Sequence, residues 1–460
     1  MPPLEVPELA SGNPQLQRAI TKIVKVEQKG LDKFDEKIAK ADAKLSIVKD
    51  LKTKFNELRD AAKPFKSVQD FRDLKGDSSS PEVVKVGAIN KELAKTGSYT
   101  FEILELAEAP SLMTMGMEDK DRSEVGVGYV SFTTPDGESH DVYIDSDSST
   151  LEGMAQKINA AGLGVKANVI NDGTDSDAPW RLVLTGEKTG WRNDMQWAEF
   201  NFLDGDMDID REYVKEAKSA MIKFNGQPMY VDENKIKDLI PGVAVDLISA
   251  KPGQTVNVEI KTDTEKVEGK AKTMVDKLNA VLTTIHSQFQ LGPDSRNDPS
   301  KALAGDVSLQ NMQSQIRSVV QDTLSDASES QIKQLRDLGI VFNRSGTLDY
   351  DPKKFQSAVD TNFEEVATLL SGDTPLSGFA NRLVQVVDNS TRTGDGILSL
   401  REKTMTESKQ RLEKQKESAT ERAEKKMERT KMQFARAEAA IEKLQKSAAA
   451  IPSGSVPGVG

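Results

Sequence analysis

The N-terminal part of the chain carries apolar residues at alternating steps of three and four. The pattern passes through Leu31, Phe34, Ile38, Ala41, Leu45, Val48, Lys52 and Phe55. Lys52 is the one departure, and its aliphatic stem can still pack against apolar neighbours. Such steps place a stripe of side chains along one face of a long helix, as in a coiled coil. Pro64 predicts the end of this helix.

The C-terminal part repeats the pattern through Met427, Thr430, Phe434, Ala437, Ile441, Leu444, Ala448 and Ile451. Residues 409–426 are nearly all Lys, Arg, Glu and Gln, which favour helix. We therefore predict a long helix at each end of the chain, paired with the other or with the same helices of neighbouring subunits. The expected contact residues are Leu31, Phe34, Ile38, Leu45, Val48, Phe55, Met427, Phe434, Ala437, Ile441 and Leu444.

The middle of the chain alternates apolar and polar residues with the period of β-strands. Residues 129–133 and 142–144 flank Asp136-Gly137, and residues 221–224 and 228–231 flank Asn225-Gly226. Asp-Gly and Asn-Gly favour tight hairpin turns. One helix is expected from about Ser149 to Ala161, with Ser149 or Thr150 as its cap. Residues 85–262 therefore read as mainly β.

Helical periodicity returns after Thr262, with further helices expected over 309–324, 355–370 and 379–388. The sequence thus predicts an α+β multidomain protein, in which mainly-β domains are inserted between long terminal coiled-coil helices and a helical domain. The expected parts are a leg (1–40 with 430–460), a helical domain (41–84 with 263–429) and the β insertion (85–262). Its inner part is expected at about 85–130 and 213–262, and its outer part at about 131–212.

Composition excludes several classes of function. The net charge of −11 argues against nucleic-acid binding, which needs a concentrated basic surface. The absence of cysteine excludes disulfides, zinc ribbons and thiol nucleophiles. No apolar run is long enough to cross a membrane, so no membrane insertion is expected. The N-terminus, Met1-Pro-Pro-Leu, has neither the basic nor the apolar region of a cleavable secretory signal.

Candidate chemistry is sparse, and we predict no catalytic, cofactor or metal site. The run from Asp204 to Asp210 resembles the start of a calcium loop, but Ile209 and Lys215 occupy the places that require Gly and Glu. Neither His140 nor His286 has a neighbouring ligand residue in the sequence. No nucleophile elbow or phosphate-binding loop is present. Three tryptophans, Trp180, Trp191 and Trp197, form a domain core or a sugar or protein contact, and a core is the commoner arrangement.

Several blocks of residues resemble a known family in content and in order. They are Thr96-Gly-Ser-Tyr-Thr-Phe-Glu-Ile-Leu, Asp238-Leu-Ile-Pro-Gly-Val, Leu303-Ala-Gly-Asp-Val, Leu338-Gly-Ile-Val-Phe-Asn-Arg-Ser-Gly and Gly378-Phe-Ala-Asn-Arg-Leu. Over nearly the whole chain the sequence resembles the flagellar filament cap family, also called flagellar hook-associated protein 2 or FliD. That family usually has a Gly/Ser-rich stretch and an Asp before its first helix, whereas here Ser11-Gly-Asn precedes Pro14.

The resemblance implies a non-enzymatic, secreted flagellar protein that forms a homo-oligomeric ring, most often a pentamer, at the distal tip of the filament. It would promote flagellin folding and polymerisation, prevent flagellin leakage and be required for filament elongation. Implied partners are flagellin, the hook-filament junction protein and an export chaperone of the type III route. Two alternatives stay open: another flagellar axial protein, or a surface adhesin that binds carbohydrate through the β domains.

Overall fold

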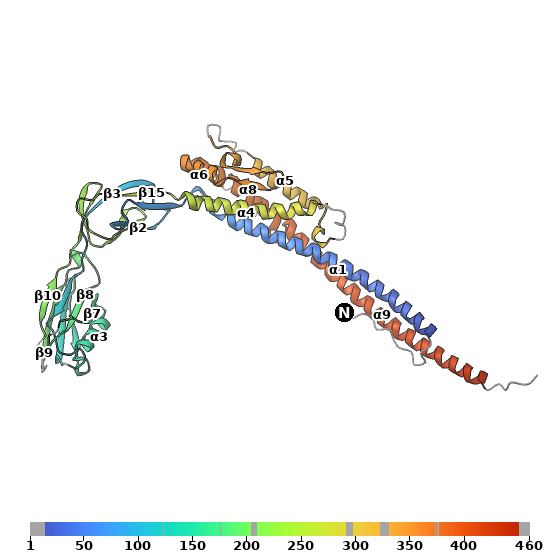
Figure 1. Cartoon of the computed structure of the whole chain (residues 1–460), viewed down its shortest axis with the longest axis horizontal. Helices are drawn as coiled ribbons and strands as arrows, with labels where there is room; N and C mark the ends of the chain where they lie inside the picture. The colour runs from blue at the N-terminus through green and yellow to red at the C-terminus, as the bar shows by residue number, and fades with distance from the viewer. Residues whose placement is uncertain are drawn as a thin grey trace, which may run out of the picture. The chain divides into compact units, whose positions relative to one another are not determined.

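The computed structural model describes residues 14–122, 124–174, 176–203, 209–290, 298–322, 331–372, 374 and 377–449. The chain divides into two compact units. The first, here called the helical unit, contains the chain up to Phe71 and from Val267 onward, and the second, the β unit, spans Arg72–Lys266. The predicted arrangement, a β insertion between two helical chain ends, is confirmed (Figure 1).

The helical unit is dominated by its two terminal helices, α1 and α9, which run side by side (Figure 1). Pro14 begins α1, where a missing backbone N–H costs nothing, and the helix ends just before Pro64 as predicted. The helices and the one hairpin are α1 (Pro14–Ala62), α2 (Val68–Phe71), α4 (Thr264–Phe289), α5 (Val307–Gln321), α6 (Pro352–Thr361), α7 (Phe363–Ser371), α8 (Phe379–Thr391), α9 (Ile397–Ala449), β16 (Ile340–Phe342) and β17 (Leu348–Tyr350).

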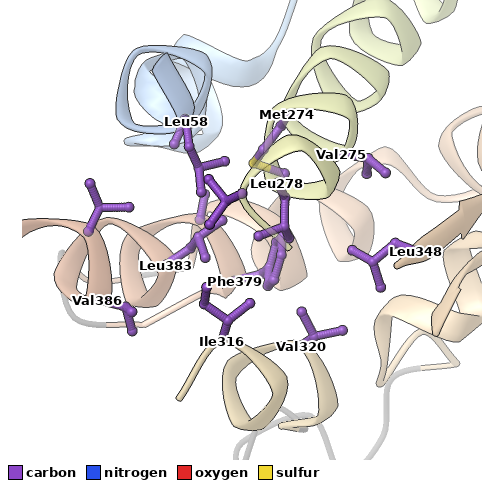
Figure 2. Packing of buried hydrophobic residues seen from close by; sticks show 14 of the residues in the cluster. Leu58, Met274, Val275, Leu278, Ile316, Val320, Leu348, Phe379, Leu383 and Val386 are labelled. Atoms are coloured by element: carbon purple, nitrogen blue, oxygen red, sulfur yellow. The ribbon is translucent and has the colours of Figure 1, made fainter. Parts of the chain in front are cut away.

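The core of this unit brings together helices that are far apart in the sequence. Leu58 of α1, Met274 and Leu278 of α4, Ile316 of α5 and Leu383 of α8 point toward one another (Figure 2). All five are almost completely buried, and each such side chain contributes about 1.5–3 kcal/mol of transfer free energy. The inner half of α1 is therefore fixed to the body of the unit.

Residues 355–370, expected as one helix, form two. Asn362 has an extended φ of −152° and ends α6, while its side chain accepts a hydrogen bond from the Glu365 N–H at the start of α7. Asn favours this capping conformation over the helix interior because its side chain can replace a backbone partner.

The β unit contains two hydrophobic cores, each enclosed by its own sheets. The inner subdomain has a five-stranded sheet of order β1-β15-β3-β11-β12 and a three-stranded sheet of order β13-β14-β2. Its strands are β1 (Leu74–Ser78), β2 (Val84–Ile89), β3 (Gly97–Glu105), β11 (Ala220–Phe224), β12 (Gln227–Val231), β13 (Lys235–Ile240), β14 (Val243–Leu247) and β15 (Val256–Thr262). The β11–β12 hairpin turns at Asn225 and Gly226, both with positive φ, as the sequence predicts.

The outer subdomain has sheets of order β10-β4-β8-β7 and β6-β5-β9, with helix α3 packed into the same core. The elements are β4 (Ser111–Thr114), β5 (Val127–Thr133), β6 (Ser139–Ile144), α3 (Leu151–Ala161), β7 (Val165–Asn171), β8 (Trp180–Gly186), β9 (Gln196–Leu203) and β10 (Arg211–Lys215). The predicted β5–β6 hairpin and α3 are confirmed, and Thr150 is the cap.

Two boundaries differ from the sequence expectation. The first strand of the β unit, β1, lies before residue 85, and its sequence Leu-Lys-Gly-Asp-Ser has no alternation to reveal it. The core of the outer subdomain includes Leu112, ahead of the expected start at about 131. β4 joins the outer sheet through pairing with β8 and β10, and such long-range pairing has no signal in a short strand. The finer five-part division of the chain stays a prediction.

Candidate assembly surface

The outer halves of α1 and α9 form an antiparallel pair whose apolar stripe follows the predicted positions on α1. Leu31, Leu45, Val48 and Phe55 are buried. Phe34 and Ile38 are half-buried. On α9, Met427 is buried and Phe434 is half-buried. These residues thus pack within one chain, and Val48 and Phe55 belong to the core of the helical unit.

Three of the predicted contact residues have no such burial. Ala437 is exposed, Ile441 is 37% exposed and Leu444 is 68% exposed. The register of the antiparallel pair explains this exposure. Because the two helices run in opposite directions, the residues near the end of α9 lie close to the start of α1. The last turns of α9 extend beyond the first turn of α1 (Figure 1). Within the described residues these apolar side chains therefore remain accessible to another molecule.

A small apolar cluster closes the outer end of the helix pair. Ile20 and Val24 of α1 are buried against Met427 of α9, with Ile23 and Phe434 packed beside them. Ile20 and Val24 were not among the predicted contact residues, although they continue the same three-four spacing from Leu31 toward the N-terminus. Extending the pattern would have found them.

Four ion pairs link the two helices along their length. Glu27–Lys426 and Asp35–Lys416 have N···O distances of 2.5 Å, Asp42–Lys409 2.7 Å and Lys52–Glu402 2.9 Å. The carboxylate of Asp42 raises the pKa of Lys409, so that lysine stays charged. Exposed pairs of this kind stabilise little, but opposite charges at fixed spacing specify orientation and register.

The middle of the helix pair has no buried apolar residue. Between Leu31 and Leu45 of α1, and between Leu398 and Thr420 of α9, no described side chain is buried. Three of the four ion pairs connect these two stretches or lie close to them. The outer cluster is therefore joined to the body of the unit through a polar, solvated segment.

The other candidate residues do not form a chemical site. Trp180 packs against the outer core, whereas Trp191 is 59% exposed, so the core assignment is wrong for Trp191. The side chain of Trp197 and the acidic residues 204–208 lie outside the described residues. The described part of the chain contains no group of three or more possible metal ligands. In the same ranges, no helix has both the length and the apolar character that crossing a membrane requires.

Comparison with known proteins gives the family. A family model described as the C-terminus of flagellar hook-associated protein 2 matches residues 217–446, and the model of its N-terminus matches residues 14–110. The chain belongs to the flagellar hook-associated protein 2 family. This is a family of structural flagellar components rather than enzymes.

The chain is also similar to individual proteins. The B-type flagellar hook-associated protein 2 of Pseudomonas aeruginosa is 26% identical over 381 residues, 78% of this chain and 77% of the relative. The crystal structure of domains D1–D3 of the flagellar cap protein FliD from Escherichia coli has a TM-score of 0.60 at 22% identity, covering 78% of this chain and 99% of that one. The flagellar cap protein FliD of Bdellovibrio bacteriovorus is 36% identical, with a TM-score of 0.36, over 39% of this chain and 98% of that one.

Proposed function

We propose that this protein caps the flagellar filament. In this role it forms an oligomeric ring at the distal tip, promotes folding and polymerisation of flagellin and keeps flagellin from leaking into the medium. Family membership supports the role. The structural observation that carries it is the outer end of α9, where Ile441 and Leu444 extend past α1 with exposed apolar side chains.

The terminal helix pair suits the function of a leg that binds helices of the filament end. Apolar residues at positions i, i+4 and i+7 on an exposed helix bind a partner helix by burying a shared stripe. Ala437, Ile441 and Leu444 have this spacing. The partner helices would belong to flagellin, to the hook-filament junction protein or to neighbouring copies.

Further parts of the proposal come from the family resemblance. The ring is a homo-oligomer, with five subunits as the expected number. The chain is exported through the type III route with the help of an export chaperone, and is therefore secreted without a cleaved signal. The absence of cysteine suits a chain that passes through a narrow channel in an extended form, because no disulfide can form on the way.

The structure gives the adhesin alternative no specific support. A cavity of about 310 Å³ in the outer subdomain is lined by the β5–β6 turn and by residues around Gly186, including Asp136 and Glu187, and its described lining has no tryptophan. Trp191 lies outside this lining and stacks with the Arg192 guanidinium, 5.1 Å from the ring centroid.

Labelling intact filaments tests the proposal and separates the flagellar alternatives. Because the chain has no cysteine, Asp177→Cys in an exposed loop provides one reactive thiol for a gold label, and the wild-type chain is the control. A cap places the label only at distal ends. Label at the filament base would indicate a junction protein, label along the filament would indicate a flagellin, and either result would overturn the proposal.

A further inference from the structure

The outer subdomain exposes a sheet face that is aromatic and acidic. In the sheet β6-β5-β9, Val130 and Phe132 point into the core, so the alternate residues of β5 point away from it. On that outward side Tyr129 is 48% exposed and Tyr143 is 50% exposed. Their ring centroids are 5.2 Å apart. The two rings form a ridge on the surface of the sheet.

Strand pairing arranges this face in two rows. One row crosses the three strands as Asp141, Ser131 and Glu199, and the next as Tyr143, Tyr129 and Asn201. Asp141 accepts a hydrogen bond of 2.6 Å from the hydroxyl of Ser131, and a neutral hydroxyl does not cancel the charge of the carboxylate. Neither carboxylate forms an ion pair with another described residue. The first row therefore carries two uncompensated negative charges. We call these two rows the acidic face.

The inner subdomain exposes a face on which two lysines flank one aspartate. In the sheet β13-β14-β2, one row crosses the strands as Lys235, Asp246 and Lys85. Beyond this row both pairings shift register, between Ile236 and Ile240 and between Val243 and Val245, and Ala244 and Gly87 lie next to each other there. We call the charged row together with Ala244 and Gly87 the basic face.

The basic face combines two lysines with two small residues. Both lysines are exposed, and neither forms an ion pair with another described residue. A Cβ placed on Gly87 would lie 3.4 Å from the Cβ of Ala244, so these two small residues lie next to each other beside the charged row. Neither carries a long side chain that would keep the aromatic rings of a partner away.

The charged rows of the two faces match in spacing. Asp141 and Glu199 are two strands apart, as are Lys85 and Lys235, and two strand spacings correspond to about 10 Å. When the charged rows face each other, the hydroxyl of Ser131 lies toward the carboxylate of Asp246. The tyrosine ridge then lies over Gly87 and Ala244.

We propose that the acidic face of one copy binds the basic face of the next copy. Two acidic faces would repel each other, and so would two basic faces, which leaves a contact between unlike faces. A contact of this heterologous kind closes into a ring when its rotation allows. The inference rests on the proposed function, because it assigns the surfaces that join neighbouring subunits of the cap.

Cysteine cross-linking tests the contact directly, since the chain has no native thiol. Full-length Ser131→Cys and Asp246→Cys chains, carrying tags of different size, are mixed, assembled and oxidised. We expect a mixed disulfide-linked dimer, while either variant alone stays at the level of the wild-type chain. The matched control replaces Asp246→Cys by Thr185→Cys, a half-buried position on the sheet β10-β4-β8-β7. A product with Thr185→Cys of equal yield would overturn the assignment.

Charge reversal provides the second test. Asp141→Lys with Glu199→Lys, or Lys85→Glu with Lys235→Glu, should each reduce the Ser131–Asp246 product to background, and combining both pairs should restore it. Loss without restoration would contradict the pairing of these rows. An oligomer that persists without the cross-link overturns this contact and leaves the cap proposal standing. A chain that forms no oligomer in solution or on filaments overturns both.

Discussion

Replacing Ile441 and Leu444 together by Asp removes the apolar surface that α9 presents beyond α1. Ile441 is 37% exposed and Leu444 68% exposed, so together they leave roughly the apolar surface of one large side chain for a partner to cover. Burying one such side chain contributes about 1.5–3 kcal/mol, which corresponds to roughly 10- to 150-fold in an association constant. Because burying Asp instead adds a desolvation cost, we expect each subunit contact to weaken by at least this factor.

The same change should leave the folded chain nearly as stable as before, because exposed substitutions usually change the unfolding free energy by less than about 0.5 kcal/mol. Thermal unfolding checks the fold, sedimentation gives the oligomer mass, and electron microscopy gives filament length. Lys443→Asp is the matched control, since it makes the same change of net charge in the same exposed turn. Unchanged mass together with unchanged filaments would refute the reasoning, as would an equal defect in the control.

Three further predictions concern the helix pair and the outer subdomain. Met427→Ala should lower the local free energy of unfolding by about 2 kcal/mol, at the low end for a buried methionine. Amide hydrogen exchange should become faster at the outer ends of α1 and α9, while the main unfolding transition stays in place. Unchanged exchange at these ends would be inconsistent with the apolar cluster. Asp42→Lys should speed hydrogen exchange in the middle of the helix pair, and adding Lys409→Asp should restore the slower exchange. The difference in exchange rate should shrink in about 1 M salt, where the Debye length is about 3 Å. If the double variant does not restore protection, the Asp42–Lys409 ion pair has no role in joining the helices. Hydrogen bonds from Lys157 and Ser148 lower the pKa of Asp145 to about 2, and those from Thr174 and Arg181 do the same for Asp172. A lowered folded-state pKa gives stability that is present above the unfolded-state pKa near 4 and is lost as the pH falls toward 2. Acid titration should therefore show the outer subdomain losing stability between these pH values. Asp145→Asn together with Asp172→Asn should abolish this loss.

The elements with strong local signals could be predicted from the sequence. The three-four spacing from Leu31 to Phe55 gave the stripe of α1, and Asn225-Gly226 gave a hairpin because few other residue pairs adopt positive φ so readily. The strand β1 was missed because Leu-Lys-Gly-Asp-Ser has no period and forms only by pairing with β15.

Register between distant segments was beyond the sequence pattern. The three-four spacing runs without interruption from Met427 to Ile441 and Leu444. Nothing in this spacing reveals that the contact with α1 stops before Ile441. The two charged faces are hidden in the same way, because Lys85 and Lys235 become neighbours only through β14. Pairwise alignment of strands, which depends on tertiary packing, creates these surfaces.

The most direct test of the cap function is deletion of the gene in its host, followed by measurement of flagellin in cells, on filaments and in the medium. We expect short or missing filaments with flagellin accumulating in the medium, and restoration of both by the intact gene. Filaments of normal length with no flagellin in the medium would contradict it.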